Sequence, residues 1–355
     1  MSDVDPTYIG AYGKIKAYST DFLSPEFVSR VFEAKNIDEI ISALYSTFYR
    51  QDFDLFSTTS KGIELLSNAI NHRLVLRNRI SLMGAPAPGR EILRAYLSKW
   101  DIENIKIILS SKYMGYSLKE TENYILSFRD IPLGIFGGRL THSDFRSLLS
   151  QGSIESVVSY LSNYGYGQIL LEEMEKYRRI NDISILLSAL DKYYFTNLLS
   201  SVKYYNGDEG PVFRFFRELI DAKNVMVILK GKEMNVDYQR FSGSLIPGGN
   251  ITLSSLEEMF MAPDINEALR RLSIGEQSRD RILKASGAGK LQMIESAISS
   301  AIYTSYAERF QNLALSIGFT FSFIMRAERE RENLRSAILG NVYNISRERI
   351  ASLIY

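Results

Sequence analysis

A stretch of 23 residues occurs three times in this chain of 355 residues, and it constrains the fold more than any other feature. The copies align without a gap, at offsets of 117 and 111 residues. They are FLSPEFVSRVFEAKNIDEIISAL at 22–44, RLTHSDFRSLLSQGSIESVVSYL at 139–161 and NITLSSLEEMFMAPDINEALRRL at 250–272. A chain that repeats a segment of this length is expected to repeat a unit of structure.

Each copy predicts a helical hairpin in which both helices begin at a capping residue. The first helix can be capped by Ser24, Thr141 or Thr252, whose side-chain oxygens can accept a hydrogen bond from a backbone N–H in its first turn. The second helix has equivalent caps at Asn36, Ser153 and Asp264. After the second cap, apolar residues recur at i, i+3, i+4 and i+7, so that they form one stripe on the second helix that can pack against a core. The stripes are Ile37, Ile40, Ile41 and Leu44; Ile154, Val157, Val158 and Leu161; and Ile265, Ala268, Leu269 and Leu272.

A second string recurs further along each copy, as WDIENIKIILSSKYMG at 100–115 and IDAKNVMVILKGKEMN at 220–235. A looser third copy, ERENLRSAIL at 330–339, has Glu330 and Asn333 where the others have aspartate and asparagine, and a one-residue slip follows. An acid three residues before an asparagine lies on the same helix face, and an acid near a helix start favours the helix dipole. We interpret the pair as a helix start with a packing hydrogen bond, in preference to a direct partner contact.

Long apolar patterns at helical spacing dominate the chain, and no series of alternating strands interrupts them. The predicted fold is all-α, with three similar helical modules at 1–128, 129–241 and 242–355. Loop signals stand at GAPAPGR (84–90), NGDEGP (206–211) and SGSLIPGGN (242–250). A repeat unit of about 110 residues is too large for a tetratricopeptide or HEAT array.

Composition excludes several function classes. The net charge of +1 gives no electrostatic pull toward nucleic acid or anionic lipid. The chain has no cysteine and only two histidines, so thiolate sites and histidine-rich metal sites are excluded. The N-terminal segment has no apolar core and reads as no secretory signal. The apolar run at 313–325 is shorter than the roughly 20 residues that span a bilayer, and it predicts a buried core helix.

No motif in the sequence matches a known catalytic or nucleotide-binding pattern. SGAGK at 286–290 departs from the phosphate-loop pattern, because Lys284 stands at the first glycine position and Leu291 follows the lysine. His72 and His142 are predicted to be surface or packing residues. The segment ERERE at 328–332 is predicted to be a solvated face of ion pairs, and a contact with a partner is the alternative for this segment. We therefore predict no catalytic, cofactor-binding or metal-ligating residue, and we assign no interface residue.

The residues alone predict a non-enzymatic helical scaffold, either an adaptor or a mechanical coupling part. An enzyme that uses carboxylates at an unrecognised site remains a further alternative.

Three segments resemble one known family in their order and spacing. They are 8–49, 92–115 with its counterpart 215–235, and the ending AERERENLRSAILGNVYNISRERIASLIY at 327–355. The chain resembles the C subunit of the archaeal A-type and bacterial V-type ATP synthases, the counterpart of the d subunit of the eukaryotic V-ATPase. The resemblance covers essentially the whole chain, and an unrelated helical-repeat adaptor is the alternative.

The resemblance implies a funnel of three helical domains with pseudo-threefold symmetry and a central socket. Such a protein sits on the proteolipid rotor ring, peripherally on the cytoplasmic face of the cell membrane, and touches the membrane only through its partners. Its socket receives the D and F subunits of the central stalk, and it transmits torque for proton- or sodium-driven ATP synthesis or hydrolysis. It is not an enzyme and needs no cofactor, since ATP chemistry belongs to the A and B subunits. No nucleic acid is implied.

Overall fold

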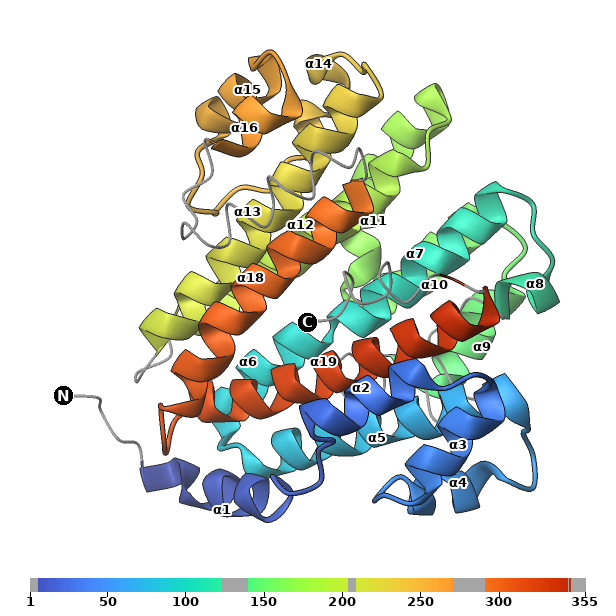
Figure 1. Cartoon of the computed structure of the whole chain (residues 1–355). Helices are drawn as coiled ribbons and strands as arrows, with labels where there is room; N and C mark the ends of the chain where they lie inside the picture. Colours follow the sequence, from blue (N-terminus) through green and yellow to red (C-terminus); the bar gives the residue numbers. More distant parts are fainter. Residues whose placement is uncertain (1–5, 123–139, 204–208, 271–290, 344, 346–355) are drawn as a thin grey trace. The chain divides into compact units, whose positions relative to one another are not determined.

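The computed structural model describes residues 6–122, 140–203, 209–270, 291–343 and 345, and among these every regular element is a helix (Figure 1). The all-α prediction is therefore confirmed. The α-helices are α1 (Ile9–Ala17), α2 (Pro25–Glu33), α3 (Ile37–Tyr45), α4 (Arg50–Phe56), α5 (Gly62–Gly84), α6 (Ala87–Leu97), α7 (Lys99–Tyr113), α8 (Leu118–Glu122), α9 (His142–Ser150), α10 (Ile154–Leu161), α11 (Tyr166–Ile180), α12 (Ser184–Val202), α13 (Glu209–Glu233), α14 (Tyr238–Phe241), α15 (Leu253–Met261), α16 (Ile265–Arg270), α18 (Leu291–Gln311) and α19 (Ile317–Val342). Short 3-10 turns are η1 (Pro6–Tyr8), η3 (Ser162–Tyr164) and η4 (Ser242–Ser244).

The chain divides into two compact units, one of which is assembled from distant segments. Unit 1 contains residues 1–87, 207–211 and 273–355, and unit 2 contains 88–206 and 212–272. Within unit 1, α19 lies against α2, α3 and α5, although it comes from the other end of the chain (Figure 1, red against blue). Within unit 2, α11 packs between α10 and α12, and α7 contacts both α10 and α12. The module boundaries at 128/129 and 241/242 stay a prediction.

The three predicted hairpins are present as α2–α3, α9–α10 and α15–α16. Every predicted cap forms its hydrogen bond, since each side-chain oxygen accepts from the backbone N–H three residues later. At the start of α9 the bond is reciprocal, because the Asp144 carboxylate also accepts from the backbone N–H of Thr141, at 2.7 Å. Local sequence thus fixes where each hairpin helix begins.

The predicted apolar stripes face the cores of their own units. In α10 all four stripe residues are buried, and Leu161 has no exposed surface. In α3, Ile40 and Leu44 are buried beside Leu66 of α5 and Leu334 of α19. In α16 the described stripe residues Ala268 and Leu269 are also buried. The side chains of Ile265 and Leu272 lie outside the described part of the chain.

The structure corrects the bounds of three predicted segments. The buried core helix predicted for 313–325 is confirmed for 317–325, which form the first part of α19. It does not extend over 313–316, because Leu315 has a φ of 55° and Ser316 caps α19. Most of the predicted loop at 84–90 belongs to α6, where Pro88 occupies the second position and needs no backbone donor. Gly210 and Pro211 likewise lie in the first turn of α13. Across the described ranges no helix is both long and apolar enough to cross a membrane.

Candidate functional site

The acid–asparagine pairs lie on three helices and are buried. Asp101 and Asn104 lie on α7 with no exposed surface, whereas Asp221 (9% exposed) and Asn224 lie in the middle of α13. Glu330 (6% exposed) and its asparagine lie in the middle of α19. The predicted helix start is therefore correct for Asp101 alone, and the shared role of the three acids must come from what they contact.

Each acid accepts a hydrogen bond from the same backbone position of the next hairpin. Leu140 N–H donates to Asp101 Oδ2 at 3.3 Å, and Ile251 N–H donates to Asp221 Oδ1 at 3.0 Å. Glu330 Oε2 accepts from Leu23 N–H at 2.7 Å. In the sequence alignment Leu23, Leu140 and Ile251 are equivalent, each directly before the first cap. The acid helix of each copy thus docks on the hairpin of the following copy, and the third docks on the first.

A buried tyrosine adds a second donor in two of these docking sites. Tyr166 donates to Asp101 Oδ2 at 2.9 Å, and Tyr49 donates to Glu330 Oε1 at 2.7 Å. Burial and the neighbouring Glu330 carboxylate raise the pKa of Tyr49 well above its ordinary value. The two tyrosines are 117 residues apart, the offset of the hairpins, and that offset is the signal that could have identified them.

At the α13 docking site the asparagine clamps a single backbone unit. Asn224 Nδ2 donates to the Ile246 carbonyl and its Oδ1 accepts from the Ile246 N–H, both at 2.8 Å. The adjoining Gly249 lies so close that a Cβ there would overlap the Asp221 carboxylate. The packing role predicted for the acid–asparagine pair is confirmed here.

The ends of the acid helices are alike in all three copies. After each helix, a backbone N–H at an equivalent position donates to a carbonyl in the last turn. The pairs are Tyr116 to Ser111, Val236 to Gly231 and Ile345 to Gly340, at 2.9–3.0 Å.

One side chain near each helix end also reaches the carbonyls where the first hairpin helix stops. Lys112 donates to Leu149, Lys232 to Phe260, and Asn341 to Ala34. Because Asn341 occupies the same position as the two lysines, the third copy continues in register, and the predicted one-residue slip was wrong.

The residue that follows the last turn is large, apolar and exposed in each copy. Met114 is 57% exposed, Met234 72% and Tyr343 70%. Isolated apolar residues on a surface are ordinary, but the same exposure at three equivalent positions indicates a shared role.

The ERERE segment is not the solvated ion-pair face that its charges predicted. Glu330 and Arg331 are 6% and 4% exposed. Besides its two uncharged donors, Glu330 Oε1 accepts from Arg77 Nη1 at 2.9 Å, and both side chains are buried. The buried carboxylate is thereby neutralised and hydrogen bonded, as a buried charge must be.

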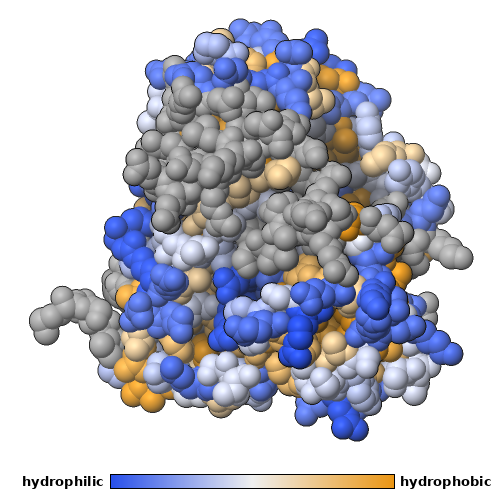
Figure 2. Space-filling view, viewed as in Figure 1, coloured by the Kyte–Doolittle hydropathy of each residue, from blue (hydrophilic) through white to orange (hydrophobic). Residues whose placement is uncertain are grey.

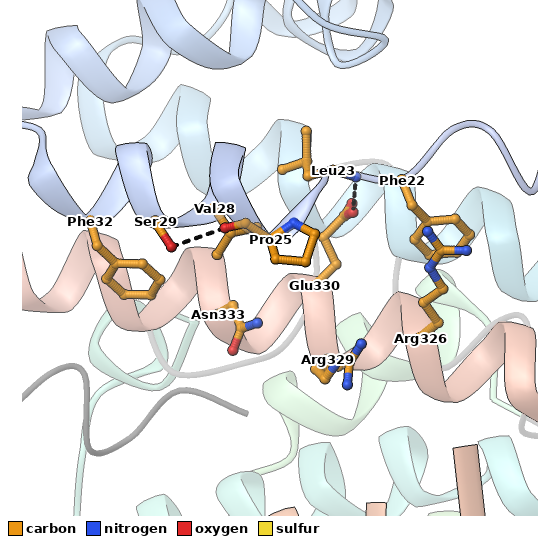
Figure 3. Close-up of a pocket in the computed structure, with 10 residues that line it drawn as sticks. All are labelled: Phe22, Leu23, Pro25, Val28, Ser29, Phe32, Arg326, Arg329, Glu330 and Asn333. Atoms are coloured by element: carbon orange, nitrogen blue, oxygen red, sulfur yellow. Dashed lines mark hydrogen bonds between the residues drawn. The ribbon is translucent and has the colours of Figure 1, made fainter. Parts of the chain in front are cut away.

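A pocket of about 170 Å³ lies beside this carboxylate, between α2 and α19 (Figure 3). We call it the α2–α19 pocket. It is lined by Phe22, Leu23, Pro25, Val28, Ser29, Phe32, Arg326, Arg329, Glu330 and Asn333. The guanidinium groups of Arg77 and Arg326 lie 3.9 and 4.0 Å from the centre of the Phe22 ring. In Figure 2 hydrophilic and hydrophobic residues are interspersed over this region of unit 1.

Of the two histidines, the structure describes the side chain of His72, which contacts a buried carboxylate. Asp52 is buried and is bound by His72 Nδ1 at 2.5 Å and by Arg73 Nε at 2.7 Å, so His72 is held in a packing network. SGAGK and the His142 side chain lie outside the described residues. Among the residues that are described, no cluster of three or more histidine, aspartate or glutamate side chains could hold a metal ion.

Comparison with known proteins gives one consistent family. The model of the ATP synthase (C/AC39) subunit family matches residues 11–353. The C subunit of the A-type ATP synthase of Thermoplasma volcanium is 40% identical over 351 residues, which cover 99% of each chain. The protein of the same name from Thermoplasma acidophilum is 38% identical over 99% of each chain. That of Methanocaldococcus jannaschii is 24% identical over 98% of this chain and 85% of its own.

Proposed function

The chain belongs to the ATP synthase (C/AC39) subunit family and is a non-catalytic subunit of an A/V-type ATP synthase, and from this premise we propose that it couples rotor to stalk. In this role it joins the D and F subunits of the central stalk to the proteolipid ring and carries torque between them. Family membership removes the alternative of an unrelated helical adaptor.

The observation that carries the proposal is the sequence of docking contacts. Asp101 binds the second hairpin, Asp221 the third, and Glu330 returns to the first. From contacts that run from each copy to the next and then back to the first, we infer a closed ring of modules. They support a pseudo-threefold funnel with a central socket, built from modules at 1–128, 129–241 and 242–355.

The chemistry of these contacts suits a part that must carry load. Each docking acid is buried, and backbone or side-chain donors hold its carboxylate in one position. Breaking such a contact leaves a buried charge without its partner, which makes sliding between helices unfavourable. Close packing of the surrounding helices adds low compressibility.

The three exposed helix ends support a contact with a partner. Met114, Met234 and Tyr343 offer an apolar side chain at equivalent positions, and methionine adapts well to a partner surface. In the proposed role these ends face other rotor subunits, and the protein lies peripherally on the cytoplasmic face of the cell membrane. The complex keeps its partners at high effective concentration, so a modest contact area suffices.

A pull-down from detergent-solubilised membranes tests the proposal. The tagged full-length chain is expressed in its native host, and the bound proteins are identified by mass spectrometry. We expect the proteolipid together with the D and F subunits of the stalk. Recovery of the catalytic subunits without the proteolipid or the stalk would place the chain elsewhere in the complex and overturn the coupling role.

A further inference from the structure

The α2–α19 pocket carries positive charge that the described residues do not neutralise. Arg326 and Arg329 line it, and neither forms an ion pair with a carboxylate in the described part of the chain. Glu330, the acidic residue among those that line it, is already paired with Arg77 at 2.9 Å. Burial lowers the pKa of Arg326, Glu330 raises it, and Arg77 and Arg329 lower it again, with a net lowering. Two guanidinium groups therefore line the pocket beside one carboxylate, Glu330, which they share with Arg77.

Comparison of the three copies shows that docking does not require these arginines. In the first copy, the residues four positions and one position before the docking acid Asp101 are Leu97 and Trp100. The second copy has Arg217 and Ile220 at the same positions before Asp221. Arg217 is satisfied within its own unit, because it donates to the carbonyls of Gly248 and Gly249 at 3.1 and 2.7 Å. The arginine pair is thus an addition to one docking site.

The walls of the pocket favour one kind of anion. Five of its lining side chains are apolar, namely Phe22, Leu23, Pro25, Val28 and Phe32. The first turn of α2 offers few donors, because Pro25 has no N–H and the Phe27 N–H is taken by Ser24 Oγ at 3.2 Å. A phosphate group needs many donors around it, whereas a carboxylate on an apolar stem needs a fork of guanidinium groups and an apolar wall.

We propose that the α2–α19 pocket binds a glutamate or aspartate side chain of a partner protein, with Arg326 and Arg329 holding the carboxylate and Phe22 and Val28 packing on the adjoining apolar residues. Figure 3 shows both arginines on the α19 side and the apolar residues on the α2 side. The proposal that the pocket binds an acidic side chain rests on the residues that line it. Only the identification of its source as a rotor or stalk subunit rests on the proposed function.

Two peptides of matched shape test the binding on the full-length protein. Isothermal titration at fixed ionic strength compares acetyl-Leu-Glu-Leu-amide with acetyl-Leu-Gln-Leu-amide, and inorganic phosphate is the third ligand. We expect the glutamate peptide to bind at least about tenfold more tightly than the glutamine peptide, a difference of about 1.4 kcal/mol. Equal affinity of the two peptides, absence of binding, or preference for phosphate would each overturn the proposal.

Variants locate the binding in the pocket. Arg326→Gln/Arg329→Gln is expected to abolish the preference for the glutamate peptide, whereas Arg335→Gln, an exposed arginine on the same helix, keeps it. Arg329→Gln alone leaves the stacking of Arg326 on Phe22 in place. It therefore tests the pocket even if the double variant misfolds. If both arginine variants retain the preference, the peptide binds elsewhere and the assignment fails.

A final comparison separates this inference from the rotor function. Full-length protein carrying the double substitution is mixed with the purified remainder of the ATP synthase, and its affinity is compared with that of the unaltered chain. Loss of about tenfold or more assigns the acidic segment to a subunit of the complex. If the double variant assembles normally but no longer binds the peptide, the pocket stands as a binding site, and its proposed source in the complex is wrong. If the unaltered chain itself fails to assemble, only the proposed function is contradicted.

Discussion

The carboxylate of Glu330 accepts a hydrogen bond from the backbone N–H of Leu23, 307 residues earlier in the chain. The same oxygen pair also binds Tyr49 and Arg77, which belong to two further elements of unit 1. A single side chain near the C-terminus thus fixes three elements from the first quarter of the chain.

Glu330→Ala should be the most damaging change at the docking sites. It leaves the buried Arg77 guanidinium without its partner, and breaking a buried pair lowers the free energy of unfolding by about 3–5 kcal/mol. Urea denaturation followed by circular dichroism measures the loss. Glu64→Ala, on the exposed side of α5, should change it by less than about 0.5 kcal/mol. Similar losses for the two variants would show that Glu330 does not hold unit 1 together.

Asn224→Leu tests the clamp in unit 2. The substitution keeps the branched outline of the side chain and leaves both the N–H and the carbonyl of buried Ile246 without partners, which should lower the free energy of unfolding by about 2–4 kcal/mol. The exposed Asn163→Leu is the matched control and should be close to neutral. A neutral Asn224 variant would mean that water or another side chain replaces the clamp.

Gly249→Ala probes the close approach of the loop to the Asp221 carboxylate. A methyl group there displaces the carboxylate from the N–H groups of Asn250 and Ile251, at an expected loss of about 1–3 kcal/mol. Gly243→Ala adds the same methyl group where nothing lies within 4 Å. Thermal unfolding should separate the two, and equal midpoints would contradict the overlap.

Leu161→Asp should unfold the second hairpin, because it places an unpaired charge on a stripe residue with no exposed surface. We expect a loss of about 4 kcal/mol or more, with reduced helical circular dichroism. Ser159→Asp puts the same carboxylate on the exposed side of α10 and should leave the spectrum unchanged.

Asp144 gives a dependence of stability on pH. Burial raises the pKa of this carboxyl, but hydrogen bonds from Tyr164, Thr141 and Tyr160 outweigh it, and the net pKa is lowered. A group with a lowered pKa in the folded state stabilises the protein above its unfolded pKa of about 4, and the contribution disappears as the pH falls toward the folded pKa.

Asp144→Asn should therefore lower the free energy of unfolding by about 1–2 kcal/mol at pH 7 and by progressively less below about pH 5. Urea denaturation at several pH values measures the difference between the two proteins. Asp38→Asn, an exposed carboxylate in the first turn of α3, serves as the control. A difference that stays constant down to pH 3 would contradict the assignment.

The hairpins could be predicted from sequence because their signals are local. A cap such as Ser153 bonds three residues away, and the stripe from Ile154 to Leu161 needs only helical spacing. The partners of Asp101, Asp221 and Glu330 could not be predicted, because each lies in the next copy and no spacing rule connects them. The tyrosines Tyr49 and Tyr166 could have been found as a pair from their offset of 117 residues, but the offset does not say that they donate to Glu330 and Asp101.

Charge patterning alone misled the interpretation of ERERE. Alternating charges are typical of a solvated face, yet Glu330 had already aligned with Asp101 and Asp221, two residues set among apolar neighbours. The repeat was the stronger guide, because it compares equivalent positions of one structure. The α2–α19 pocket had no sequence signal, since its walls come from residues 22–32 and 326–333.

The discontinuous make-up of unit 1 also sets an order of events during synthesis. Helices α1 to α5 leave the ribosome first, but their docking partner α19 is translated roughly 300 residues later, a delay of about 15–60 s at ordinary elongation rates. Throughout that interval Leu44, Leu66 and Ile70 lack the cover that Leu334 and Ile338 provide in the finished core. Nascent chains of this protein are thus natural clients for a chaperone, and prematurely terminated ones natural substrates for proteolysis.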